Sequence, residues 1–186
     1  MALLDAAAAI LERDGIAALT LRAAAREAGV SHAAPAHHFG GLSGLLSELA
    51  ASGFVRFRAR MQAEADAAGT APQARMIGLY RGYVGFARGS PGLFLLMFRS
   101  EQLDWSTPAL AAAGPAAFAL LTQAEAELPA TPSGLHNLVA ATARWSLVHG
   151  LSMLIIDGRL GGVSERVRPG TDIEALVEQV LAAGLA

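Results

Sequence analysis

The sequence predicts an all-α protein of about nine helices, and three observations support that fold class. Apolar residues recur with the 3.6-residue period of a helix along most of the chain, and no segment alternates convincingly with the two-residue period of a strand. Alanine, the strongest helix former, supplies 41 of the 186 residues. Glycine and proline gather where helices would stop and restart, for example at 69–72. We expect a three-helix N-terminal domain over 1–47 and a larger helical domain over 48–186.

Several of the predicted helices have ordinary start and stop signals. Thr20 and Ser31 are typical N-caps, and Gly15 and Gly29 are typical residues just after a helix C-terminus. A mobile loop rich in glycine and arginine is expected over 158–170. The predicted helices span 2–14, 20–29, 31–40, 42–68, 72–89, 92–100, 108–128, 133–157 and 171–184.

The composition limits the chemistry available to the chain. It is 53% hydrophobic and 16% charged, which is unlike a disordered chain. The absence of cysteine excludes disulfides, thiol catalysis, iron–sulfur clusters and cysteine-based zinc sites. All 14 basic residues are arginine, so a P-loop lysine, a Schiff base and pyridoxal phosphate chemistry are excluded as well. No cofactor is expected.

The chain has no global basic charge, so any signal for nucleic acid must be local. Its formal net charge is −2 at pH 7. The most membrane-like stretch, 105–124, contains serine, threonine, glycine and proline and is otherwise mostly alanine, so no membrane span is expected. No basic segment precedes Asp5 and Glu12, so no signal peptide is expected and the predicted location is cytoplasmic.

Residues 20–39 predict two short helices joined by a tight turn. The first helix has one small apolar face, made of Leu21, Ala24, Ala25 and Ala28. Arg22 and Arg26 lie on the opposite side, Gly29 supplies the turn, and Val30 is expected to enter the core. This arrangement is a helix-turn-helix, whose second helix is free to lie in the major groove of DNA.

The local charge also favours DNA. Between residues 20 and 60 the chain holds five arginines and two glutamates, although its overall charge is −2. His32, His37 and His38 fall in the same stretch, and such side chains contact phosphates. Their spacing does not suit metal ligands on one helix face, so no metal site is expected. The alternative that stays open is a three-helix corner with no role in DNA binding.

The run ALTLRAAAREAGVSHAAPAHHFGGLSGLL resembles the DNA-binding domain of TetR-family transcriptional regulators, and the resemblance covers residues 1–47. Residues 72–186 resemble the C-terminal domain of a subgroup marked by Trp-His-Gly, here Trp145, His149 and Gly150. The resemblance implies a homodimer that reads a palindromic DNA operator with the second helix of the motif. It also implies a repressor that is released by a small, largely apolar effector bound in the C-terminal domain.

The expected DNA contacts follow from the motif and from this resemblance. They are Thr20, Arg22, Ser31, His32, Ala33, Ala34, His37 and His38. Ala33 and Ala34 are small enough to approach thymine methyl groups. Ala36 and Leu42 stand where the family usually has a tyrosine and a lysine that contact phosphates. Losing phosphate contacts weakens binding to every DNA sequence, so a modest affinity is expected.

The C-terminal part offers a candidate effector site of aromatic and methionine side chains around His149. The expected lining is Tyr80, Tyr83, Phe86, Phe94, Met97, Phe98, Trp105, Phe118, Trp145, His149 and Met153. Two interpretations stay open. His149 either orients a ligand or is a core histidine with its hydrogen bonds satisfied, and the aromatic residues either line a pocket or form ordinary core.

Four glycines share one face of the helix predicted over 72–89, namely Gly78, Gly82, Gly85 and Gly89. Glycine inside a helix costs about 1 kcal/mol relative to alanine, so a stripe of four indicates that space is needed there. The stripe either permits close packing of a neighbouring helix or clears one wall of an effector pocket.

The last two predicted helices are apolar on broad faces, and pairing them across a two-fold axis would form a four-helix dimer interface. The chain lacks the G-x-S-x-G, H-E-x-x-H and G-x-G-x-x-G patterns, so no enzymatic activity is expected. The alternative function is a helical protein that binds a small molecule and whose DNA binding is weakened or lost.

Overall fold

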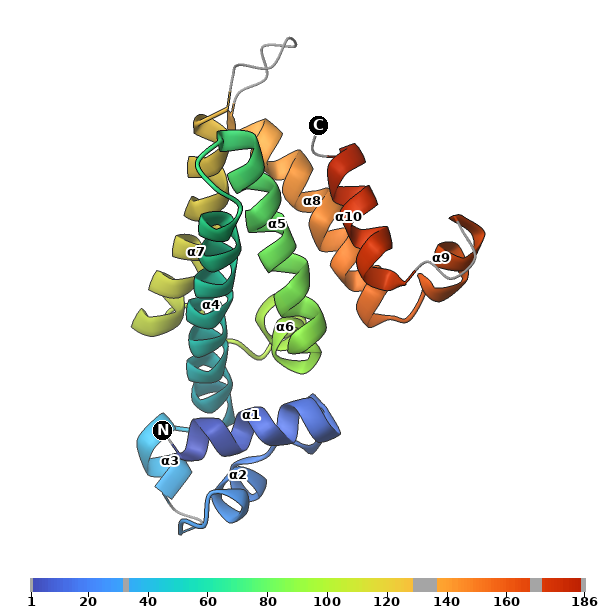
Figure 1. The fold of residues 1–186 in the computed structure, drawn as a ribbon. Helices are drawn as coiled ribbons and strands as arrows, with labels where there is room; N and C mark the ends of the chain where they lie inside the picture. Colours follow the sequence, from blue (N-terminus) through green and yellow to red (C-terminus); the bar gives the residue numbers. More distant parts are fainter. Residues whose placement is uncertain (1, 32–33, 129–136, 168–171, 185–186) are drawn as a thin grey trace. The chain divides into compact units, whose positions relative to one another are not determined.

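The computed structural model describes residues 2–31, 34–128, 137–167 and 172–184, and every regular element in these ranges is a helix (Figure 1). The predicted all-α class is therefore confirmed. The elements are α1 (Ala2–Asp14), the 3-10 turn η1 (Ile16–Ala18), α2 (Leu21–Glu27), α3 (Ala34–Phe39), α4 (Leu42–Ala67), α5 (Pro72–Gly89), α6 (Pro91–Arg99), α7 (Pro108–Ala126), α8 (Asn137–Ile156), α9 (Gly161–Val167) and α10 (Ile173–Gly184).

The chain forms two compact units. Unit 1 consists of Met1–Arg56 and Ser90–Ala117, and unit 2 consists of Phe57–Gly89 and Phe118–Ala186. The predicted DNA-binding helices therefore share unit 1 with α6 and the first part of α7. Unit 2 holds α5, α8, α9 and α10 together with the ends of α4 and α7.

In unit 1, α1 is joined to α6 by a carboxylate that caps a helix. The backbone N–H of Gly92 donates a 2.9 Å hydrogen bond to Glu12 Oε2, and that of Leu93 donates a 2.9 Å hydrogen bond to Glu12 Oε1. A negative side chain at a helix N-terminus satisfies backbone donors and interacts favourably with the helix dipole. Glu12 thus fixes the start of α6 against α1 within this unit.

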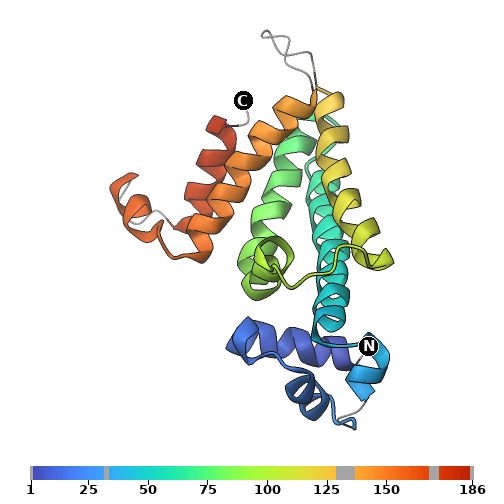
Figure 2. The same cartoon turned by 180° about the vertical axis from the view of Figure 1, so that it is seen from behind.

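In unit 2, α5, α8 and α10 run side by side, as both views of the ribbon show (Figure 1, Figure 2). The Arg81 guanidinium of α5 donates two hydrogen bonds, of 2.6 and 2.7 Å, to the Glu178 carboxylate of α10. Arg88 and Glu174 form a second ion pair between the same two helices. Apolar side chains on the three helices are buried, including Met76, Tyr80, Tyr83, Val148 and Leu181.

The glycine stripe of α5 is explained by close helix packing. A Cβ atom on Gly78 would lie 2.5 Å from the Glu64 backbone oxygen, and one on Gly82 would lie 2.6 Å from the Met61 Cα. These distances leave no room for a side chain, so the backbones of α4 and α5 touch here. The alternative of a cleared pocket wall is therefore wrong for Gly78 and Gly82.

The predicted loop over 158–170 is wrong in part, because residues 161–167 form α9. The sequence disfavours this helix since it opens with two glycines. Burial compensates, because Leu160 and Ser164 are buried. A local hydrogen bond of 2.8 Å from the Ser164 hydroxyl to the Gly161 carbonyl adds to it. Residues 168–170 lie outside the described residues.

One helix in the described part of the chain, α8, is long and apolar enough to cross a membrane by length and composition alone. It has a mean hydropathy of 1.4, and the more polar stretch 105–124 was the one singled out from the sequence. Core and interface helices of proteins that never enter a membrane pass the same test. A single helix of this kind is weak evidence for a membrane span.

Candidate nucleic-acid interface and ligand core

The helix-turn-helix begins with a well-formed cap on α2. The Thr20 hydroxyl accepts a 3.1 Å hydrogen bond from the Ala23 backbone N–H, as expected for an N-cap. Ala24 and Ala25 are fully buried, which lets α2 pack closely on its neighbours within unit 1. Gly29 follows the helix with a φ of 67°, a left-handed conformation that glycine adopts without strain. Thr20 and Gly29 therefore fulfil the expected structural roles, whereas the predicted cap at Ser31 is not observed among the described residues, because α3 begins at Ala34.

The turn differs from the prediction at Val30. Its backbone N–H donates a 3.0 Å hydrogen bond to the Ala25 carbonyl, but its side chain is 38% exposed. The backbone thus closes the end of α2 while the side chain points to solvent, so the expectation that Val30 enters the core is wrong. Pro35, in the first turn of α3, is buried instead.

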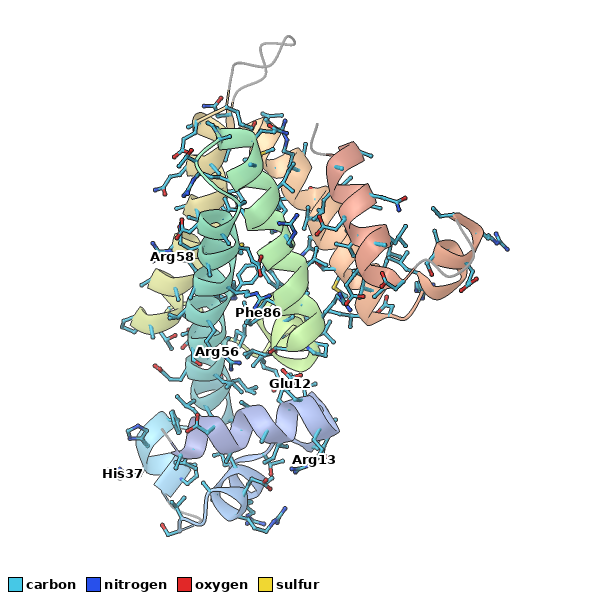
Figure 3. The ribbon with its side chains drawn as sticks, viewed as in Figure 1. Glu12, Arg13, His37, Arg56, Arg58 and Phe86 are labelled. Carbon is cyan, nitrogen blue, oxygen red and sulfur yellow. The ribbon has the colours of Figure 1, made fainter. Side chains whose placement is uncertain are left out.

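The described part of α3 presents polar side chains to solvent. His37 and His38 are exposed, and Figure 3 shows the His37 imidazole projecting away from the helix. The His38 ring also meets the Phe39 ring edge-on at 4.7 Å. Ser31 is exposed just before the motif's second helix. His32 and Ala33, and the side chain of Ala34, lie outside the described residues.

The electrostatics of this region favour anions. Arg22 and Arg26 are exposed and form no ion pair with the residues that the structure describes. Glu27, the carboxylate nearest to them in sequence, is instead paired with Arg13 at 3.3 Å. Two guanidinium groups on the outer face of α2 are therefore free to bind phosphate oxygens.

The core of unit 2 contains a hydrogen-bonded group of three predicted ligand-site residues. The Trp145 indole N–H donates to the Tyr83 hydroxyl oxygen at 3.1 Å, and that hydroxyl lies 2.8 Å from His149 Nδ1. Since the hydroxyl accepts from Trp145, its own proton is available for Nδ1, which favours the Nε2–H tautomer of His149. Burial raises the pKa of Tyr83, and the hydrogen bond from Trp145 opposes that effect in part. The tyrosine is therefore a neutral donor, and His149 has its polar partner.

A second buried polar group, which the sequence interpretation missed, lies between α7, α8 and α5. Glu125 is 4% exposed and forms an ion pair with Arg144. Burial raises the pKa of Tyr80, the charge of Glu125 raises it further, and the charge of Arg144 lowers it, so all three side chains interact. A signal existed, because Glu125 is the only residue among Asp, Glu, Lys and Arg in α7 and Arg144 is the only one in α8.

The predicted effector residues are divided between the two units. Phe94, Met97, Phe98 and Trp105 belong to unit 1, where the Phe94 and Phe98 rings lie 4.8 Å apart and Phe54 contacts both Phe98 and Trp105. The remaining residues, Tyr80, Tyr83, Phe86, Phe118, Trp145, His149 and Met153, belong to unit 2.

Within unit 2 the aromatic rings are in direct contact. The Phe118 and Trp145 rings meet at 5.4 Å, and Phe57 meets both Tyr83 at 4.7 Å and Phe86 at 5.2 Å. Phe54 and Phe57, both on α4, were not among the predicted residues. Tyr80, Tyr83, Phe86, Phe94, Met97 and Met153 are buried.

A separate hollow of about 110 Å³ opens between α4, α5 and α7 of unit 2. None of its lining residues belongs to the predicted effector site. They are Gln62, Ala65, Arg75, Leu79, Leu120, Gln123, Ala124 and Glu127. Arg75 is already paired with Asp66 at 3.1 Å. Within the described ranges, no three His, Asp or Glu side chains come close enough together to hold a metal ion.

Two family models match this chain, one in its N-terminal part and one in its C-terminal part. Residues 3–49 match the family model of bacterial regulatory proteins of the tetR family, and residues 76–183 match that of the tetracyclin repressor-like C-terminal domain. The chain belongs to the TetR family. It is thus a transcriptional regulator of the helix-turn-helix type. The C-terminal match includes Trp145, His149 and Gly150, while the Trp-His-Gly subgroup itself stays a prediction.

Solved structures agree with this assignment. The TetR-family chain shares 31% identity with a protein with unknown function from Rhodococcus sp. RHA1, with a TM-score of 0.79 over 99% of this chain and 90% of that one. A TetR family transcription regulator from Marinobacter aquaeolei VT8 shares the fold at 16% identity, with a TM-score of 0.67 over 98% of this chain and 93% of that one. No curated protein matches the sequence.

Proposed function

We propose that this TetR-family regulator binds a palindromic DNA operator as a homodimer and represses transcription until a small effector releases it. The observation that supports the proposal best is the exposed polar face of α3, which follows a capped α2 and a left-handed glycine turn. Such a helix suits the major groove, where its N-terminal residues contact base edges. The effector acts only through its different affinities for the two states of the protein.

The DNA contacts are proposed in two groups. Thr20, Arg22, His37 and His38 contact phosphates, and they set the position of the protein on the duplex. Ser31 and the three residues after it approach the bases, with Ala33 and Ala34 against thymine methyl groups. Phosphate contacts weaken with salt, so the number of contacts is measurable from the salt dependence of binding.

The proposed dimer interface is the outer face of α8 together with α10. Leu138, Val139, Leu147 and Leu154 are exposed on α8, and only 33% of its most apolar window is buried in the single chain. An apolar helix with so little cover needs a partner. A second copy of the chain supplies it, because a two-fold interface sets two recognition helices on two half-sites. Val148, Leu151, Leu176 and Val177 are buried within the chain and serve its own core.

The proposed effector site is the aromatic core of unit 2 around Tyr83, Trp145 and His149. Ligand sites are commonly apolar with a few polar groups that fix orientation, and this core has that composition. The hydrogen bond between Tyr83 and His149 is one that a ligand would exchange for its own. The proposal includes no catalytic step.

The test is fluorescence anisotropy with a labelled duplex from the intergenic DNA beside the gene, compared with a scrambled duplex of the same composition. We expect the native duplex to bind at least about 1,000-fold more tightly, the low end for specific binding. Arg22→Ala is expected to weaken binding to both duplexes and to reduce the salt slope by about one unit. Arg166→Ala, at an exposed arginine of α9, is the matched control and leaves binding unchanged.

A second candidate function is a helical small-molecule binding protein with weakened DNA binding. Ala36 is exposed on α3 and Leu42 begins α4, so neither position offers a phosphate contact. Equal and weak binding of the native and scrambled duplexes, with effector binding retained, would favour this function over repression.

A further inference from the structure

The buried carboxylate of Glu125 has one oxygen in use and one without a partner. Arg144 binds Oε1, while Oε2 is buried and accepts no hydrogen bond from any residue in the described ranges. A buried charged oxygen without a donor is costly, and such atoms are rare in native proteins. The arrangement therefore calls for a donor from outside the described side chains.

Tyr80 offers a complementary group within electrostatic range of Glu125 in the core of unit 2. Its side chain is 1% exposed, and its hydroxyl forms no hydrogen bond with the residues that the structure describes. Burial and the charge of Glu125 both raise the pKa of Tyr80, so the hydroxyl keeps its proton and remains a donor. The cluster of Glu125, Arg144 and Tyr80 thus holds one unused acceptor, Glu125 Oε2, and one unused donor, the Tyr80 hydroxyl.

A hydroxyl group on a ligand can satisfy both the Glu125 acceptor and the Tyr80 donor, since a hydroxyl donates one hydrogen bond and accepts others. We propose that the effector carries an uncharged hydroxyl, as in a phenol or an alcohol, which donates to Glu125 Oε2 and accepts from the Tyr80 hydroxyl. This inference rests on the proposed effector role of the unit 2 core and names the chemical class that the core selects.

The charge of the cluster excludes ionic ligands. Arg144 already compensates Glu125, so an ammonium group would bring an unpaired positive charge into the interior. A carboxylate would face the negative oxygen of Glu125 directly. A neutral hydroxyl adds no net charge.

The aromatic side chains around this cluster indicate what the rest of the ligand is made of. Tyr83 lies one turn after Tyr80 on α5, so the two tyrosines share a face of that helix. The Trp145 indole N–H donates to the Tyr83 hydroxyl at 3.1 Å, and the Trp145 ring meets Phe118 at 5.4 Å. The body of the ligand therefore lies against aromatic rings, which favours an apolar and preferably aromatic skeleton.

The experiment is isothermal titration calorimetry on the full-length protein without DNA, using four probes in matched pairs. These are phenol with its methyl ether anisole, and 2-naphthol with its methyl ether 2-methoxynaphthalene. An ether oxygen accepts a hydrogen bond but donates none. We expect each hydroxylated probe to bind about ten- to a hundredfold more tightly than its ether, the effect of losing one hydrogen bond to a charged group.

Glu125→Gln replaces the free oxygen with an amide N–H₂ donor, so the preference for the hydroxyl is expected to fall to near one. Glu127→Gln removes the same charge two residues away, at an exposed position of the same segment, and is expected to keep the preference. Tyr80→Phe removes the donor and is expected to lower the preference several-fold. Circular dichroism checks the fold of each variant. If Glu125→Gln does not fold, the hydroxyl preference of Tyr80→Phe tests the inference, and an unchanged preference there overturns it.

Equal affinities for hydroxyl and ether in the wild type would overturn the inference, and so would an unchanged preference in Glu125→Gln. The first result is also the one expected if a water molecule satisfies both groups. Failure of both hydroxylated probes to bind the folded protein overturns it too. Operator binding is measured separately by anisotropy. Loss of operator binding alone removes the repressor function and leaves the ligand class standing.

Discussion

The two units of the molecule arrange their polar side chains in opposite ways. In unit 1 the polar groups proposed to act are exposed, and the hydrogen bond that shapes the motif joins residues three apart, Thr20 and Ala23. In unit 2 the polar groups of the ligand core lie inside the fold, with Tyr83 and Glu125 buried and Arg144, Trp145 and His149 half-buried. They pair across 62 residues between Trp145 and Tyr83, and across 19 between Arg144 and Glu125. The difference teaches that the surface for DNA is built locally, while the ligand core is built by the tertiary fold.

The largest expected effect comes from breaking the buried ion pair of unit 2. Arg144→Ala leaves the Glu125 carboxylate buried with no compensating charge, which costs about 3–5 kcal/mol of unfolding free energy. Urea unfolding followed by circular dichroism measures it. Arg22→Ala, at an exposed arginine of unit 1, is the control and is expected to change stability by less than about 0.5 kcal/mol. Similar losses in both variants would contradict the contrast between the units.

The next effect comes from filling the contact between α4 and α5. A Cβ atom on Gly82 would lie 2.6 Å from the Met61 Cα and 2.8 Å from the Arg60 backbone oxygen, so the helices must separate. Gly82→Ala is expected to lower the unfolding free energy by about 1–3 kcal/mol, the usual cost of overpacking. Thermal unfolding checks the direction.

Gly85→Ala is the matched control on the same helix. A Cβ atom there would meet only the Arg60 guanidinium, at 3.7 Å, which is an ordinary contact. Alanine is the better helix former, so this variant is expected to gain up to about 1 kcal/mol. Tolerance of Gly82→Ala would contradict the close approach at Gly82, and destabilisation by Gly85→Ala would show that the close approach extends to Gly85.

These contrasts show which parts of the fold were predictable. The cap at Thr20 and the turn at Gly29 were predicted correctly because each depends on neighbouring residues and on backbone geometry. Helix α9 was missed because its two glycines disfavour a helix and only the burial of Leu160 and Ser164 compensates. Val30 was misplaced because periodicity cannot tell whether a turn residue points inward.

The ligand core was less predictable for a related reason. Tyr83, Trp145 and His149 were singled out as site residues, but their mutual hydrogen bonds depend on how α5 and α8 pack. Glu125 and Arg144 were overlooked, although each is the only residue among Asp, Glu, Lys and Arg in its helix. An isolated charge in an apolar helix indicates burial with a partner, while the identity of that partner is a property of the tertiary fold.

A smaller effect tests the local construction of unit 1. Thr20→Ala removes the side-chain acceptor that caps α2 and leaves the Ala23 N–H without its partner. The expected loss is about 1 kcal/mol of unfolding free energy, typical for an N-cap. Thr20→Ser keeps the acceptor and serves as the control. If Thr20→Ala also weakens operator binding more than this loss explains, Thr20 contacts DNA as well as capping the helix.

The smallest expected effect is the pH dependence of the ion pair between Arg81 and Glu178. The Arg81 guanidinium, by hydrogen bonding, lowers the pKa of Glu178 below its usual value of 4.5. A lowered folded-state pKa means that the pair stabilises the fold above the unfolded-state pKa. That contribution is lost as the pH falls through the lower folded-state pKa. Since the two side chains are 41% and 46% exposed, solvent screens the pair and its contribution is about 0.5 kcal/mol.

Urea unfolding of the wild type and of Glu178→Gln at pH 7 and at pH 3 tests this sign. The wild type is expected to be the more stable at pH 7, and the difference is expected to shrink at pH 3 because protonation makes the two side chains alike. Glu127→Gln is the control, since Glu127 is exposed and forms no ion pair with the described residues. A difference that grows on acidification would mean that Glu178 is held in its protonated form.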